Sequence, residues 1–246
     1  MAAAELRVGV AGWSLPRAVL DEFPREGSHL TRYAARLNCA EINSSFYRSH
    51  QPATYARWAE SVPADFRFAV KLPRAITHDA RLRGVGDELD RFLAQARGLG
   101  DKLGCLLIQL PPSFAFDAGT AARFGALLRR RYAGAAVIEA RHASWFESPV
   151  DALLARHALG RVAADPAIVP AAAEPGGDTR ACVYFRLHGS PRMYFSVYSD
   201  AFLRALAKRI RAARSTAVPC WCVFDNTAHG GAIPNALQLQ SLLRGR

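Results

Sequence analysis

Ionisable and amide side chains recur along this chain at the ends of short apolar segments. Glu41 and Asn43 alternate with Ala40 and Ile42, and alternate residues of a β-strand lie on opposite faces of its sheet. The same alternation in later segments defines a polar set, which comprises Glu41, Asn43, Lys71, Gln109, Glu139, Arg141, Asp165, Arg186, His188 and Asp225. Carboxylates, an amine and an imidazole that lie together could perform general acid/base chemistry.

Five members of the polar set are candidate catalytic residues. They are Glu41, Lys71, Glu139, Asp165 and His188. His188 is the best acid/base candidate because the pKa of an imidazole lies near neutrality, although a histidine satisfied in the core is the alternative. Lys71 could form a Schiff base or bind an anion if its pKa were lowered. For Lys71 we favour an ion pair with Glu41 on the neighbouring strand.

Two other interpretations of the polar set compete with catalysis. Its four carboxylates and His188 could ligate a divalent metal in an isomerase-like arrangement. The interleaved cations Lys71, Arg141 and Arg186 would repel a metal, so we predict none, and the two arginines instead suit a carboxylate or phosphate. The set could also be a nearly neutral salt-bridge network. We favour a functional site, because desolvation makes buried ion pairs a poor source of stability.

Predicted loops at the same rim supply further candidates for substrate binding. They contain Trp13, His78, Trp145, Tyr194, Tyr198, Asn226, Gly230 and Gly231. The aromatic side chains could stack on a planar or sugar-like ligand, or they could simply pack against other loops. The Gly-Gly pair precedes the last helix, where barrels often bind phosphate, although it also makes ordinary turns. The other predicted binding residues are Asn43, Gln109, Arg141, Arg186 and Asp225.

Eight strand-like segments carry the polar set. They span 6–11, a stretch from residue 40, 66–72, 103–110, 135–141, 160–164, 182–188 and 220–224. Helical spacing of apolar residues covers 30–37, with Asn38 as its C-terminal cap, 52–62, 85–101, 118–132, 149–157, 200–214 and 234–243. Three prolines and a Gly-Gly pair make a regular helix unlikely to form over 166–180, between strands six and seven.

Alternating strands and helices over 246 residues, with no linker, predict a single (β/α)8 TIM barrel over residues 1–246, with the helix between strands six and seven degenerate or missing. A doubly wound sheet is the alternative, and the lack of a Gly-x-Gly-x-x-Gly motif after an early strand argues against it. Barrel active sites lie at the C-terminal ends of the strands, where the polar set gathers.

Composition restricts the partners and the compartment. The net charge of +11 raises nucleic acid as a partner, but the positive charge is nearly all arginine and is scattered, so we favour a small molecule. Five cysteines without a Cys-x-x-Cys pair indicate buried thiols rather than a disulfide framework. We expect no membrane association and a cytoplasmic location, because the chain starts without a signal-like segment and its densest apolar run is short.

The motifs of the chain resemble those of the domain-of-unknown-function 72 family (YecE-like proteins). The similar stretches include Gly12-Trp13, residues 41–48, residues 68–71 with 76–78, residues 109–112, residues 139–142 with 144–145, Asp165, residues 184–189, and residues 224–226 with 235–236. The resemblance covers nearly the whole chain and implies a TIM barrel, but no activity. The chain departs from the family pattern at Val10 and Ala11, where many members have Thr-Ser, and at Asp225, where Asn is usual.

Our leading functional prediction is an enzyme that acts by acid/base chemistry on a small polar or anionic substrate, which carries a phosphate or carboxylate or is sugar-like. The reaction class, whether hydrolase, lyase or isomerase, and the oligomeric state do not follow from the sequence. Two alternatives are a protein that processes or binds nucleic acid through its basic surface, and a barrel that binds a ligand or acts as a scaffold without catalysis.

Overall fold

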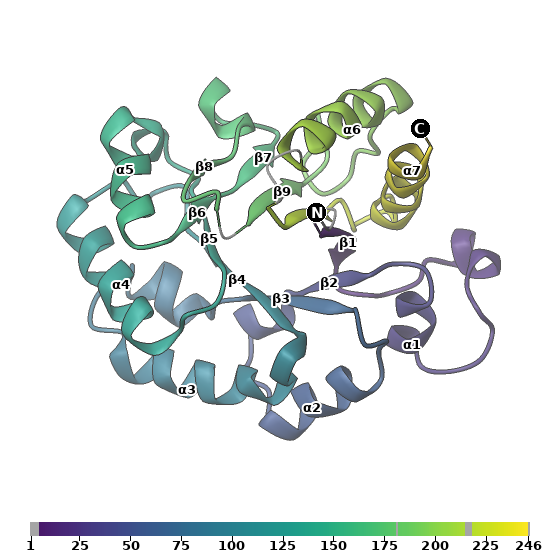
Figure 1. Ribbon diagram of the computed structural model, residues 1–246, viewed down its shortest axis with the longest axis horizontal. Helices are drawn as coiled ribbons and strands as arrows, with labels where there is room; N and C mark the ends of the chain where they lie inside the picture. Colours follow the sequence, from purple (N-terminus) through teal and green to yellow (C-terminus); the bar gives the residue numbers. More distant parts are fainter. Residues whose placement is uncertain (1–4, 181, 215–217, 246) are drawn as a thin grey trace.

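Strands form the centre of the molecule and helices surround them (Figure 1). The computed structural model describes residues 5–180, 182–214 and 218–245; the start of the chain, where we expect no signal peptide, lies largely outside these ranges. The strands are β1 (Leu6–Ala11), β2 (Cys39–Ile42), β3 (Arg67–Lys71), β4 (Leu103–Gln109), β5 (Ala136–Glu139), β6 (Gly160–Arg161), β7 (Ala163–Asp165), β8 (Gly176–Gly177), β9 (Val183–Leu187) and β10 (Cys220–Phe224).

The sheet closes into a barrel because β6 and β7 are two parts of one stretch of chain. β6 pairs in parallel with β5, whereas β7 pairs in parallel with β9. Between them, the N–H of Val162 donates to the carbonyl of Ile138 at 2.9 Å. The remaining strands follow in the order β9, β10, β1, β2, β3, β4 and β5, and the short β8 adds an antiparallel edge to β6. The predicted eight-stranded TIM barrel is therefore confirmed.

Seven α-helices lie outside the barrel in the described part of the chain. They are α1 (His29–Ala34), α2 (Pro52–Glu60), α3 (Gly86–Ala96), α4 (Ala118–Arg131), α5 (Ser148–Arg156), α6 (Asp200–Arg214) and α7 (Ala232–Arg244). Side-chain caps fix two of their starts, because Ser28 accepts from the N–H of Thr31 and Asp117 accepts from the N–H of Thr120. Between β7 and β9 the chain forms a 3-10 turn, Pro170–Ala173, and the strand β8.

Short 3-10 and π-helical turns connect the main elements, and those that follow strands shape the rim of the barrel. The 3-10 turns are Arg17–Glu22, Ser44–Phe46, Arg97–Lys102 and Ala143–Phe146, and the π-helical turn is Ala75–Asp79. The predicted helix over 85–101 ends at Ala96 and continues as the third of these turns, where Gly100 adopts a φ of 51°. That left-handed conformation ends regular helix and is readily reached by glycine.

The predicted helix cap at Asn38 is wrong. Helix α1 ends at Ala34 with Ala35 as its cap, and Asn38 instead binds the backbone of β1. Its Oδ1 accepts from the N–H of Val8 at 3.0 Å, and its Nδ2 donates to the carbonyl of Leu6 at 2.7 Å. An amide side chain can satisfy a donor and an acceptor of one strand at once, so Asn38 anchors the start of β2 beside β1.

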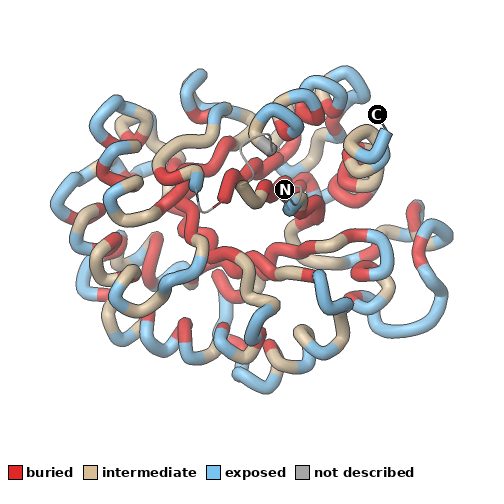
Figure 2. Tube along the Cα trace, in the orientation of Figure 1, coloured by how far each residue is buried: buried red, intermediate tan, exposed pale blue. Residues whose placement is uncertain are grey.

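Buried apolar residues form two clusters, one between strands and helices and one inside the barrel. Figure 2 shows that the strands at the centre are largely buried. The inner cluster is small, and its largest members are Tyr184 and Trp221, whose rings stack 5.9 Å apart. Gly104 makes room for the indole, because a Cβ on it would lie 2.6 Å from Trp221 Cζ2. All five cysteines are free and buried, as the sequence predicted. The apolar inner cluster fills the lower barrel and leaves the polar residues at its mouth.

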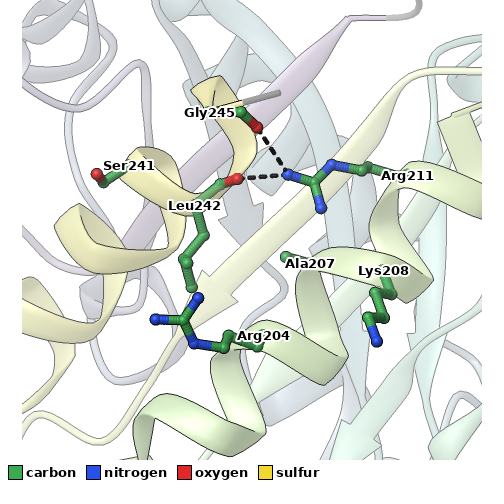
Figure 3. A pocket seen from close by; sticks show the side chains of 7 residues that line it. All are labelled: Arg204, Ala207, Lys208, Arg211, Ser241, Leu242 and Gly245. Carbon is green, nitrogen blue, oxygen red and sulfur yellow. Dashed lines mark hydrogen bonds between the residues drawn. The ribbon is translucent and has the colours of Figure 1, made fainter.

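The two last helices of the barrel are joined at the C-terminal end of α7. Arg211 on α6 donates through Nη2 to the carbonyls of Leu242 and Gly245 (Figure 3). The groove between these helices is also lined by Arg204 and Lys208. No helix within the described ranges is long and apolar enough to span a membrane.

Candidate functional site

Most of the predicted polar set meets at the C-terminal mouth of the barrel. Lys71, Gln109 and Glu139 are the last residues of β3, β4 and β5, and β4 and β5 place Gln109 directly beside Glu139. Glu41 and Arg186 come from β2 and β9, and the positions just after strands supply Asn43, Arg141, His188 and Asp225. Seven of these residues are buried despite their charge or polarity: Glu41, Lys71, Gln109, Glu139, Arg186, His188 and Asp225.

Arg186 lies at the centre of this cluster, and its guanidinium contacts three carboxylates. It is fully buried and lies 2.6 Å from Glu41 Oε1, 3.0 Å from Glu139 Oε2 and 3.0 Å from Asp225 Oδ2. Burial would lower the pKa of Arg186, but these carboxylates outweigh it and raise the pKa well above its ordinary value. Arg186 is therefore a permanent cation that lies between the three carboxylates.

Glu139 is the most connected acid of the mouth. Its oxygens accept from Gln109 Nε2 at 3.0 Å, Arg141 Nε at 3.0 Å and Arg186 Nη1 at 3.0 Å. Burial alone would raise the pKa of Glu139, but the charges of Arg186, His188 and Arg141 hold it well below its usual range. A carboxylate with this many donors is a fixed anion. Its role in proton transfer therefore remains a prediction, and its contacts argue against that role.

His188 lies between two carboxylates. Its Nε2 is 2.9 Å from Glu139 Oε1 and its Nδ1 is 3.1 Å from Asp225 Oδ2. Nitrogens of Arg186 and Arg141 approach the same ring at 3.3 to 3.4 Å, which are longer contacts, so the carboxylates decide its charge. Burial lowers the pKa of His188, but Glu139 and Asp225 more than reverse this, and the net shift is upward from 6.5. Both nitrogens then donate, which favours an electrostatic role over the predicted proton transfer.

Replacement of His188 by glutamine is expected to destabilise the protein more at about pH 6 than at about pH 9. The folded-state pKa is raised above the unfolded value of 6.5. The stabilisation by the charged ring is therefore fully present below that unfolded value and is lost as the pH rises through the folded pKa, by about 1.4 kcal/mol for each unit of the shift. Urea unfolding of both proteins at the two pH values measures this difference. Equal differences at both pH values would contradict a charged His188.

Glu41 binds residues other than its predicted partner, Lys71. It accepts from Arg186 Nε and Nη2 and from the hydroxyl of Tyr184, the last at 2.8 Å. The predicted Lys71–Glu41 ion pair is wrong, because Arg186 reaches across the barrel and occupies the carboxylate first. Sequence reasoning did not list Tyr184 as a site residue, although the alternation in β9 places it on the same face as Arg186.

Lys71 is the one cation of the polar set that forms neither an ion pair nor a side-chain hydrogen bond with the residues that the structure describes. Its side chain is 6% exposed, and its ammonium lies 4.1 Å from the centre of the Phe46 ring. Burial, assisted by the charge of Arg186 and opposed by the carboxylates, lowers the pKa of Lys71 from 10.5 to about 8. The sequence signal for Phe46 was only its place in the loop that follows β2.

His78 shares the Phe46 ring with Lys71. Its ring lies edge-on to Phe46 at 4.8 Å, and its Nδ1 is 2.9 Å from Thr77 Oγ1. Burial and the charges of Lys71, Arg74 and Arg141 lower the pKa of His78 below 6.5. His78 is therefore a neutral imidazole at neutral pH, and its Nε2 is left without a partner among the described residues.

A cavity of about 190 Å³ opens beside the charged cluster. It is lined by Glu139, Arg141, Ala164, Ile168, His188 and Met193, among others. Arg141 is partly exposed, at 19%, and its Nη2 lies 3.3 Å from the hydroxyl of Tyr194. Tyr194 itself lies edge-on to His188. Lys71 is outside this lining, and the charges of Lys71 and Arg141 both lower the pKa of His78.

The remaining amides of the mouth differ in their partners. Asn43 Nδ2 donates to Asp225 Oδ1 at 3.4 Å, while its Oδ1 is buried without a partner in the described structure. Asn226 is fully buried and donates to Ser196 O and Asn235 Oδ1, both at 3.0 Å. Asn226 therefore fixes the loop after β10 through its Nδ2, and its Oδ1, like that of Asn43, has no partner among the described residues.

Asp165 does not belong to the inward cluster. Val162 and Ala164 pack inside the barrel, so the alternate residues Ala163 and Asp165 point outward. There Asp165 Oδ1 accepts from the hydroxyl of Tyr198 at 2.8 Å. The prediction that Asp165 lies inside the barrel with the rest of the polar set is wrong. Tyr198, a predicted binding residue, also lies outside the barrel, where its hydroxyl binds Asp165.

Two predicted stacking residues also have partners within the chain. Trp13 lies edge-on to Trp58 at 5.1 Å, and Trp145 is buried with its Nε1 donating to the carbonyl of Phe114 at 2.8 Å. The contact of Trp145 agrees with loop packing, the alternative interpretation, whereas Trp13 packs against helix α2. Gly230 adopts a φ of 76° and borders a separate cavity of about 440 Å³, at the start of α7.

Comparisons with known proteins agree on one family. The family described as "Protein of unknown function DUF72" matches residues 7–246. The chain is 36% identical to UPF0759 protein YecE of Escherichia coli K12 over 108 residues, which are 44% of this chain and 38% of that protein. It is 21% identical to UPF0759 protein YunF of Bacillus subtilis 168 over 96% of this chain and 94% of that protein.

Crystal structures of similar proteins support the fold. A DUF72 family protein from Thermotoga maritima MSB8 aligns with a TM-score of 0.81 and 25% identity over 97% of this chain and 99% of its own. Another from Enterococcus faecalis V583 aligns with a TM-score of 0.79 and 20% identity over 99% of both chains, which shows the fold alone. These similarities show that the two DUF72 family proteins share the fold of this chain. They do not indicate the chemistry of the barrel mouth, which depends on its residues.

Proposed function

The chain belongs to the protein family of unknown function DUF72, and we propose that its barrel mouth is the active site of an enzyme. The enzyme acts by acid/base chemistry on a small anionic substrate that carries a carboxylate or phosphate. This proposal rests on the buried amine of Lys71, which forms no ion pair with the residues that the structure describes, beside a cluster in which the other charges have partners. The five free, buried thiols support a cytoplasmic location for the enzyme.

A purely structural network would not need Lys71. Glu41, Glu139 and Asp225 already contact Arg186, and His188 bridges two of these acids. A buried ammonium without a counter-ion destabilises a protein. Destabilising groups persist at functional sites, where strongly perturbed pKa values also cluster. Lys71, with a pKa of about 8, can exchange a proton near neutral pH, which Arg186 cannot.

The balance of charge at the mouth favours an anionic substrate. Lys71, Arg141 and Arg186 balance the three carboxylates, so the protonated form of His188, which the upward shift of its pKa favours, adds one net positive charge. Arg141 is the partly exposed cation at the cavity, and its planar guanidinium suits a carboxylate or phosphate. A cavity of about 190 Å³ restricts the ligand that it encloses to a small molecule.

Replacement of Arg141 by glutamine is expected to weaken anion binding about 10- to 100-fold, because a charge-assisted hydrogen bond contributes about 1.5–3 kcal/mol. Malonate and inorganic phosphate are the probes, and their affinities follow from calorimetry and from the rise in melting temperature with probe concentration. Arg204→Gln is the matched control, because Arg204 lies on the exposed face of α6 and pairs with Asp200. Equal affinity in the Arg141 variant, or no binding by the wild type, would contradict an anion site at this mouth.

The net charge of +11 favours nucleic-acid binding as a second candidate function. The groove between α6 and α7 is lined by Arg204, Lys208 and Arg211, but Arg204 pairs with Asp200 and Arg211 with backbone carbonyls. This candidate requires affinity for oligonucleotides that falls steeply with salt concentration. Binding that is unchanged by Lys208→Ala and by salt would count against it.

A further inference from the structure

We propose that Lys71 forms a Schiff base with the carbonyl carbon of a small anionic aldehyde or ketone. This inference rests on the proposed function and narrows its substrate class from anions in general to anions with a carbonyl group. It depends on three features of the mouth: an unpaired amine, an aromatic ring that faces it, and a neutral imidazole on the same ring.

The surroundings of Lys71 separate it from the other lysines of the chain. The chain has three lysines, at positions 71, 102 and 208. Lys102 donates to the carbonyl of Pro63 at the surface, and Lys208 is exposed on α6. Lys71 alone is buried at the C-terminal end of a barrel strand, where its amine forms no ion pair or side-chain hydrogen bond with the described residues. Its lone pair, once unprotonated, is therefore available to an electrophile.

The fraction of unprotonated amine decides whether a lysine is a nucleophile near neutral pH. A lysine with a pKa of about 8 has about a tenth of its amine unprotonated at pH 7. An unperturbed lysine with a pKa of 10.5 has less by about 300-fold. Low pKa values of this kind are produced by desolvation and by a neighbouring cation, which here is Arg186.

The neighbouring side chains fit each step of imine formation. The lone pair of Nζ attacks the carbonyl carbon, and the π electrons move to the oxygen, which takes up a proton to give a carbinolamine. Loss of the nitrogen proton and of the hydroxyl as water then gives the protonated imine, and no oxidant or reductant is required. Neutral His78, with its free Nε2, can carry protons between nitrogen and oxygen.

The same surroundings favour the product. The iminium cation would lie where the Lys71 ammonium now lies, over the Phe46 ring at 4.1 Å, so the cation–π contact is kept. The anionic group of the substrate would be held by Arg141, whose charge also lowers the pKa of His78. A neutral carbonyl compound lacks this second contact, which is why we restrict the substrate to anionic carbonyl compounds.

Reductive trapping tests the Schiff base directly. The full-length protein is incubated with pyruvate or glyoxylate and sodium cyanoborohydride, digested, and mapped by mass spectrometry. We expect one stable adduct in the peptide that contains Lys71, formed at least about tenfold faster than adducts at Lys102 or Lys208 because more of its amine is unprotonated. Acetone, a neutral ketone of similar size, should be trapped more slowly at the same position.

Three Lys→Arg variants assign the adduct, so the assignment does not depend on the folding of any single variant. Lys71→Arg should lose the fast adduct, whereas Lys102→Arg and Lys208→Arg should keep it. Equal labelling of the three lysines in the wild type would overturn the proposal, and so would a fast adduct that survives in Lys71→Arg. If trapping at Lys71 fails while malonate still binds in an Arg141-dependent way, the Schiff base is wrong and the acid/base enzyme stands. If malonate binding fails as well, the proposed function is wrong too.

Discussion

Replacement of Arg186 by methionine is expected to lower the free energy of unfolding at neutral pH by about 3–5 kcal/mol. Methionine has a similar length and no charge, so the packing changes little while the cation disappears. Glu41, Glu139 and Asp225 would then face one another within the barrel, and the cations left nearby are Arg141, His188 and Lys71, of which Lys71 forms no ion pair with the described residues. Removal of one partner from a buried ionic cluster leaves charges that the interior cannot solvate.

The loss in Arg186→Met should shrink as the pH falls. Without Arg186, the buried carboxylates of the variant have raised folded-state pKa values, so protonation relieves their repulsion. A group whose folded pKa is raised gains stability as the pH falls through that value. Urea unfolding followed by tryptophan fluorescence at about pH 7 and about pH 5 measures both effects. The control is Arg204→Met, which removes an exposed ion pair with Asp200 and should change the free energy of unfolding by less than about 1 kcal/mol. A comparably small loss in Arg186→Met would contradict its central role.

Replacement of Lys71 by methionine is expected to raise the free energy of unfolding at neutral pH by on the order of 3 kcal/mol. The pKa of Lys71 falls from 10.5 to about 8 on folding. The charged ammonium therefore destabilises the folded state at any pH at which Lys71 is protonated in both the folded and the unfolded state. That penalty is fully present below about pH 8 and is relieved as the pH rises towards 10.5. Methionine removes the charge and keeps the contact with Phe46.

The stability difference between Lys71→Met and the wild type should therefore narrow above about pH 8. Urea unfolding across the alkaline range measures it, and the difference between the two proteins cancels the titration of their shared tyrosines. Lys208→Met, at an exposed position of α6, should have little effect on stability. A destabilised Lys71→Met would mean that the amine is a structural partner. A more stable variant that has lost trapping would identify a trade of stability for function.

The barrel followed from the sequence because its signals are local. Strand β1 begins and ends where the apolar run 6–11 does, and β10 matches the segment 220–224. The alternation in β9 placed Arg186 and His188 on the inward face, where the structure has them. Period-two patterning is strong wherever a helix covers the outer face of a strand, because that face must be apolar.

The same rule failed at strand six because no α-helix follows it. The stretch after β7 contains a 3-10 turn and β8, so polar residues can face outward there. Arg161 pairs with Asp151 on α5, and Asp165 accepts from Tyr198. Both polar side chains are satisfied outside the barrel, and alternation alone assigned Asp165 to the wrong face.

The pairing within the mouth could not be predicted. Several acids and cations that converge from opposite strands allow many arrangements, and sequence separation does not rank them. Adjacency suggested Lys71 as the partner of Glu41, but Arg186 reaches that carboxylate from β9 across the barrel and Tyr184 supports it. The isolation of Lys71, on which the function depends, follows from that long-range contact and is visible only in three dimensions.

The titration of Lys71 decides whether the barrel mouth contains a reactive amine. Protein labelled with ¹³C at lysine Cε should give a simple spectrum, because the chain contains only the lysines at 71, 102 and 208. Loss of one signal in each Lys→Arg variant assigns them. We predict that the Lys71 signal titrates with a pKa of about 8, below that of Lys208. A Lys71 signal that titrates together with that of Lys208, near the unperturbed value of 10.5, would contradict a reactive amine at the barrel mouth.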